Sequence, residues 1–155
     1  MDSDALWILI IAVVGFVGVL VWNSEFFDNV LLRWTNSHMS KDVAHQAVKE
    51  LIDEINDSCP QQLQEGIILK RVYLKGKYYV YSFFVDHDVF SIEALREGGE
   101  AQTNELKAGL IKEGEELTNA LLRKAEYGVI YEYIDQTNHE KYIVKIEHTE
   151  LNTTT

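Results

Sequence analysis

The apolar positions of this chain fall into one continuous run and several shorter periodic segments. The run, residues 5–22, holds no charged residue. Beyond it, apolar residues recur at helical spacing in some segments and alternate with polar ones, as in half-buried strands, in others. Helical spacing covers 24–34, 41–57 and, in pieces, 90–126; strand alternation covers 67–74, 78–85, 129–134 and 141–146. The pattern predicts an apolar N-terminal helix followed by an α-β-β-α-β-β domain.

The apolar run has the length of a transmembrane helix. Eighteen helical residues rise about 27 Å, close to the ~30 Å hydrocarbon core of a bilayer. Trp7 and Trp22 bracket the run and Phe16 lies within it, and tryptophan favours the headgroup level. A buried core helix and a cleaved signal peptide are the alternatives. The residues before the run are acidic rather than basic, and no small-x-small cleavage site follows it, so we expect an uncleaved anchor in the lipid bilayer.

The expected domain boundaries follow from these segments. Residues 1–22 form the lead and anchor, and 23–40 a juxtamembrane helix and linker. Residues 41–148 form one α+β domain, and 149–155 a frayed tail. Pro60 ends the 41–57 helix, because the residue before a proline is disfavoured in the α region.

The strand segments pair most simply as two hairpins. Residues 75–77 make the first turn around Gly76, where a positive φ is required. Gly98, Gly99 and Gly114 divide the helical region, and Gly128 is expected to end it in a left-handed conformation. The predicted fold is therefore α+β, with a four-stranded antiparallel sheet and helices on one face.

Several short motifs resemble a known group of proteins. Ser58-Cys59-Pro60 precedes a hairpin, and Tyr81, Phe83 and Val85 alternate in its second arm. Ala125, Gly128, Tyr131 and Tyr133 follow the last helix at fixed spacing. Together these motifs resemble a family of small bacterial membrane-anchored proteins and lipoproteins of unknown function, over about residues 45–148. The resemblance implies a fold and a bacterial origin but no activity, and this chain lacks the cysteine of a lipoprotein anchor.

Charge and cysteine content narrow the function classes. The chain has a formal net charge of −11. All 14 Lys and Arg, and 23 of the 25 Asp and Glu, follow residue 22, which leaves the domain near −9. That charge disfavours nucleic acid and anionic lipid headgroups as partners. Cys59 is the single cysteine, so an intramolecular disulfide and a cysteine-based metal site are excluded.

Two arguments conflict on which side of the membrane the domain lies. Arg33 and Lys41 follow the anchor and no basic residue precedes it, so the positive-inside rule favours the cytoplasm. Chains built from a short N-terminal anchor and one domain commonly export that domain. We expect a single-pass protein of the inner membrane with an extracytoplasmic domain, and the cytoplasmic alternative stays open.

Candidate chemistry is sparse. Asp86-His87-Asp88 has two kinds of metal-ligating group, but a turn after a strand explains them, and a metal needs further ligands. Cys59 beside a proline fits packing better than nucleophilic catalysis. We therefore expect no catalytic, cofactor or metal site. The predicted function is a membrane-tethered, non-catalytic interaction or scaffold module that binds another protein or a second copy; the alternative is an envelope-associated hydrolase or redox enzyme with an unrecognised site.

Strand alternation places an apolar surface on the outside of the sheet. With Tyr79, Tyr81 and Phe83 pointing inward, the neighbouring positions point outward. Six large residues are expected there: Tyr73, Tyr78, Val80, Phe84, Ile130 and Ile143. A contiguous apolar patch of this kind marks a partner-binding face. The alternative is that another segment of the same chain covers it.

Overall fold

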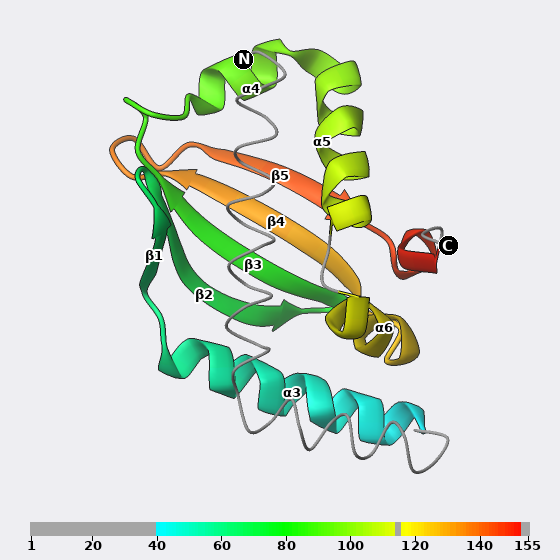
Figure 1. Ribbon diagram of the computed structural model, residues 1–155. Coiled ribbons are helices and arrows are strands. Elements are labelled where there is room, and N and C mark those ends of the chain that lie inside the picture. Colours follow the sequence, from blue (N-terminus) through cyan, green and yellow to red (C-terminus); the bar gives the residue numbers. More distant parts are fainter. Residues whose placement is uncertain (1–39, 114–115, 153–155) are drawn as a thin grey trace.

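A computed structural model describes residues 40–113 and 116–152 of the chain, drawn in colour in Figure 1. The α+β class is confirmed. The described elements are α3 (Lys41–Asp57), β1 (Gln61–Gln64), β2 (Ile67–Lys75), β3 (Tyr78–Val85), α4 (Ile92–Glu97), α5 (Gly99–Glu113), α6 (Glu116–Lys124), β4 (Gly128–Asp135), β5 (Lys141–Ile146) and a 3₁₀ helix (His148–Asn152).

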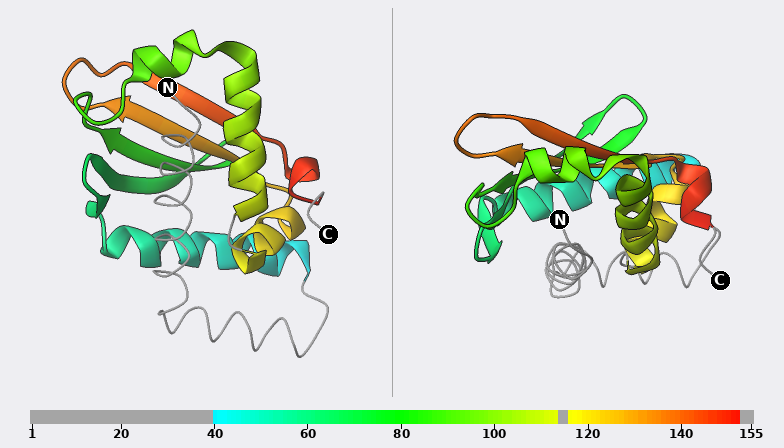
Figure 2. Two further views of the ribbon diagram at one scale, coloured as in Figure 1. Left: turned by 45° about the horizontal axis from the view of Figure 1, so that its top comes forward. Right: turned by 90° about the horizontal axis from the view of Figure 1, so that it is seen from above.

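The five strands form one mixed sheet in the order β1-β2-β3-β4-β5. The β1–β2, β2–β3 and β4–β5 pairs are antiparallel, whereas β3 and β4 are parallel along their whole length. The expected four-stranded antiparallel sheet is therefore wrong in strand number and in one pairing direction. Helices α4, α5 and α6 form the crossover that parallel neighbours require, and they lie together on one side of the sheet (Figure 2).

Helix α3 has the predicted bounds, and its signals are local. The side chain of Ser40 accepts a hydrogen bond from the Val43 amide at 3.2 Å, which caps the first turn. Near the other end, Asn56 binds the backbone of β2: Val72 N–H donates to its Oδ1 at 2.8 Å, and its Nδ2 donates to the Val72 carbonyl at 2.9 Å. Strand β1 pairs only with the start of β2. Asn56 therefore binds backbone groups of β2 that lie past the β1–β2 pairing.

The core lies between the helices and the inward side chains of the sheet. Its centre is a set of aromatic rings from the two parallel strands. Tyr81 stacks on Tyr131 with ring centroids 5.2 Å apart, and Phe83 stacks on Tyr133 at 5.4 Å. All four rings are buried, as the alternation predicted. Parallel pairing in register brings these like residues side by side.

Two local expectations differ from the structure. Gly128 is not left-handed; it begins β4, and the positive φ just after α6 belongs to Glu126, at 61°. A Cβ on Gly128 would lie 2.7 Å from the Ile146 carbonyl oxygen, so close packing of the strands explains this glycine. The expected frayed tail from residue 149 is instead a 3₁₀ helix as far as Asn152, and Leu151 is buried.

Candidate functional site

The outer face is the side of the sheet formed by the β2–β5 side chains that alternate away from the core. It contains the six residues predicted from the sequence, and the alternation itself is correct. Their exposure differs from the expectation. Ile143 is 49% exposed, Val80 is buried at 1%, and the other four are half-buried. The outer face is therefore not an open apolar patch.

Basic side chains lie over the aromatic rings of the outer face. Lys70 Nζ lies 4.9 Å from the centre of the Phe84 ring, and the Arg71 guanidinium lies 4.5 Å from that of Tyr73. Lys145 Nζ lies 4.4 Å from that of Tyr78. A cation over an aromatic ring is attracted by the ring's negative face, and its methylene stem covers apolar surface.

A bulge between Leu69 and Arg71 brings two basic residues together on this face. Arg71 is paired across from Ser82, an outer-face position, and the extra residue, Lys70, reaches the Phe84 ring on the same side. The Tyr78 hydroxyl further along the face donates to Glu147 Oε1 at 2.8 Å. The Tyr78 side chain beneath Lys145 raises the pKa of that lysine, so Lys145 stays positively charged.

Charge is unevenly divided between the sheet and the helices. The five strands hold five basic residues, which all lie on the outer face: Lys70, Arg71, Lys75, Lys141 and Lys145. They hold two carboxylates, Glu132 and Asp135, and both are buried. Helix α3, by contrast, has five Asp and Glu against two Lys. The chain is acidic as a whole, but its outer face is basic.

Glu132 is the one carboxylate that the described strands place on the outer face. Ser82 Oγ donates to its Oε1 at 2.9 Å, and the Tyr73 hydroxyl lies 3.4 Å from its Oε2. Lys141 Nζ is 3.9 Å from the same oxygen. Burial, and then the charge of Glu132, raise the pKa of Tyr73, so that hydroxyl stays protonated and donates. These contacts satisfy a buried charge, which is otherwise costly.

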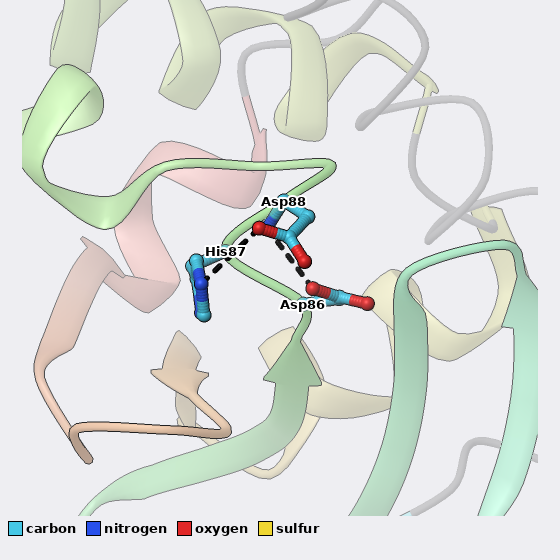
Figure 3. Close-up of side chains that lie close together, drawn as sticks. All are labelled: Asp86, His87 and Asp88. Atoms are coloured by element: carbon cyan, nitrogen blue, oxygen red, sulfur yellow. Dashed lines mark hydrogen bonds and ion pairs between the residues drawn. The ribbon is translucent and has the colours of Figure 1, made fainter.

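The Asp86-His87-Asp88 turn brings three metal-ligating side chains close together at the end of β3 (Figure 3). One ligand atom from each lies within 4.8 Å of the others. Their existing contacts are those of a turn. The Asp88 amide donates to Asp86 Oδ1 at 2.9 Å, and His87 Nδ1 lies 3.0 Å from the Thr137 hydroxyl. One short exposed segment supplies all three groups, which is an incomplete shell for a structural metal.

Cys59 is half-buried against the core. Burial raises the pKa of its thiol, so the reactive thiolate is scarce at neutral pH. This environment is typical of a packed cysteine, in agreement with the sequence interpretation.

The anchor residues Trp7, Phe16 and Trp22 lie outside the described residues. Within residues 40–113 and 116–152, none of the helices combines the length and apolar character needed to span a membrane.

Comparisons with known proteins give a fold relationship alone. A scan against protein-family models gives no match, and a search of curated proteins gives none. One solved structure is similar: a crystal structure from Pseudomonas aeruginosa described as that of a "putative secreted protein". It matches with a TM-score of 0.57 and 9% identity, over 76% of this chain and 100% of that chain. At this identity the likeness shows the fold alone.

Alternation places Arg71, Lys141, Lys145 and Glu132 on the outward side from the sequence alone. Sequence reasoning nevertheless treated that side as apolar, and so missed its basic character and the contacts of Glu132. It could not have placed Glu132 beside Ser82, because that contact depends on the parallel register of β3 and β4.

Proposed function

We propose that this protein is a membrane-tethered, non-catalytic interaction module whose binding surface is the outer face. The observation that carries the proposal is the basic and aromatic character of this face on an otherwise acidic chain. Lys141 and Lys145 each lie 3.9 Å from a carboxylate, Glu132 and Glu147 respectively. Five cations against these two carboxylates leave the outer face net positive, and such a field attracts an oppositely charged partner.

The tether is assigned to the apolar run 5–22, and the domain to the extracytoplasmic side of the inner membrane. The length and composition of the run support the tether. The name of the structurally similar Pseudomonas protein describes that protein as secreted, which supports the extracytoplasmic placement of the domain.

Carbonate extraction of membranes from cells expressing the full chain tests the tether. The protein should stay in the pellet, and a variant with Ile10→Arg and Val14→Arg in the run should be released. Release of the unchanged chain, or a mature N-terminus near residue 23, would contradict an anchor. Protease added to spheroplasts should degrade the domain, whereas full protection would place it in the cytoplasm.

Photo-crosslinking in intact cells tests the binding surface. A photoreactive side chain at Ile143 lies on the outer face, and one at Glu54 lies on the exposed side of α3. We expect adducts, with protein or lipid, from position 143 and far fewer from position 54. Equal yields from both positions would refute the assignment of the outer face as the binding surface.

A further inference from the structure

The outer face has the features of a surface that docks on an anionic lipid headgroup layer. Five basic residues lie on this broad sheet face against two carboxylates: Glu132 is buried and bound by Ser82, and Glu147, just beyond β5, accepts from the Tyr78 hydroxyl. Tyrosine and lysine both suit a membrane interface, because each has an apolar body and a polar end. Ile143, at 49% exposure, adds an apolar contact between Lys141 and Lys145.

The negative net charge of the chain does not prevent such contact at physiological salt. The Debye length is about 10 Å at 0.1 M salt, and a helix is about 10 Å thick. Carboxylates on the far side of the helices are therefore largely screened from a surface that touches the outer face. The cations on the outer face touch that surface directly and are screened much less.

The same geometry disfavours single-stranded nucleic acid as the occupant. Proteins that bind it use open aromatic faces on which bases stack. On the outer face, the rings of Tyr73, Tyr78 and Phe84 are each covered by a basic side chain within 4.9 Å of the ring centre. The cations remain available to phosphate, but these three rings do not present a free face to a base.

The proposed tether brings the domain to the lipid surface. Residues 23–40 separate the apolar run from α3, which begins at Lys41. The sequence predicts a helix over 24–34, which rises about 16 Å, and the other seven residues span up to about 23 Å when extended. This reach exceeds the ~13 Å radius of gyration of a domain this size, so the outer face can turn to the bilayer.

We propose that the outer face docks reversibly on the anionic phospholipid surface of the membrane in which the chain is anchored. This inference rests on the proposed function and names the chemistry of the partner. Phosphate-bearing headgroups are the ligands, and Lys70, Arg71, Lys75, Lys141 and Lys145 are the residues that meet them.

Quenching of a fluorescent label by the lipid surface tests the docking. The full chain with Cys59→Ser and Ile143→Cys is labelled and placed in lipid nanodiscs that contain headgroup-quencher lipids. Glu54→Cys on α3 supplies the matched label away from the outer face. We expect strong quenching at position 143 in discs of phosphatidylcholine mixed with phosphatidylglycerol. We expect weak quenching there in phosphatidylcholine alone, and at position 54 in both.

Matched charge reversals provide the control. Lys141→Glu with Lys145→Glu removes two cations from the outer face, whereas Lys49→Glu with Lys112→Glu makes the same change in net charge on exposed helix positions. Each basic residue near an anionic surface contributes about a fivefold gain in association, so the first pair should lose most of the quenching and the second pair little. Raising salt from about 0.1 M to about 1 M shortens the Debye length to about 3 Å and should abolish the quenching.

The outcomes separate this inference from the proposed function. Failure of the chain to co-purify with nanodiscs contradicts the tether. Co-purification with equal quenching at position 143 in neutral and anionic discs refutes docking on anionic lipid but leaves the tether intact. Equal losses for the two charge-reversal pairs also refute it. A salt-sensitive anisotropy change at position 143 with a single-stranded oligonucleotide, but with no response to phosphatidylglycerol, would assign the outer face to nucleic acid instead.

Discussion

Replacing Asn56 with alanine should measure how strongly α3 is held against the sheet. The Val72 N–H and carbonyl that Asn56 binds would lose their partners, at 2.8 and 2.9 Å. Each partly buried backbone group left unpaired costs about 1–3 kcal/mol, and alanine recovers about 0.6 kcal/mol of helix propensity. The net loss is about 2–3 kcal/mol, because both groups are near the edge of the sheet and water can reach them in part.

Thermal unfolding of the full chain in detergent, followed by circular dichroism, measures this loss. For a domain of this size, 1 kcal/mol shifts the melting temperature by about 4 °C, so Asn56→Ala should lower it by about 10 °C. Asn104→Ala is the matched control, since Asn104 is also helical but exposed on α5. The control should melt at or slightly above the parent temperature. If Asn56→Ala melts within about 2 °C of the parent, the two hydrogen bonds do not hold α3, and the reasoning fails.

Three further predictions concern single sites. Gly128→Val should lower the free energy of unfolding by about 1–3 kcal/mol, because a Cβ at this position would lie 2.7 Å from the Ile146 carbonyl oxygen. A Gly128→Ala variant that melts like the parent would contradict that contact. Ser82→Ala should lower the free energy of unfolding by about 1.5–3 kcal/mol, since the lost hydrogen bond is to a charged group, and by clearly less in a Glu132→Gln background. Zero coupling in this double-mutant cycle would contradict that hydrogen bond. Cys59 has a raised pKa, so at pH 8 iodoacetamide should alkylate it several-fold more slowly in the folded chain than in urea, and equal rates would show an open thiol.

The basic outer face shows how far composition can mislead about partners. A net charge of −11 argues against anionic ligands when charge is treated as evenly spread. The fold instead collects basic residues from β2 and β5, which are far apart in the sequence, on one side of the sheet. Net charge therefore describes how the whole chain interacts with a distant partner. It does not describe a partner in contact with one face.

The sequence by itself determined the elements whose signals are local. The helix over 41–57 follows from its apolar stripe and the stop at Pro60, and its bounds are confirmed. The strand over 141–146 follows from alternation, and its exposed and buried positions alternate as expected. These features depend on residues within a few positions of one another, so they can be read without knowing the rest of the fold.

Only the tertiary structure decided how these elements meet. Alternation is the same in parallel and antiparallel strands, so the parallel β3–β4 pairing depends on the path of α4, α5 and α6. That register in turn sets Glu132 beside Ser82. The exposure of the outer face depends on which long side chains of neighbouring strands lie over it. These contacts form only once the strands are paired, so the sequence alone does not reveal them.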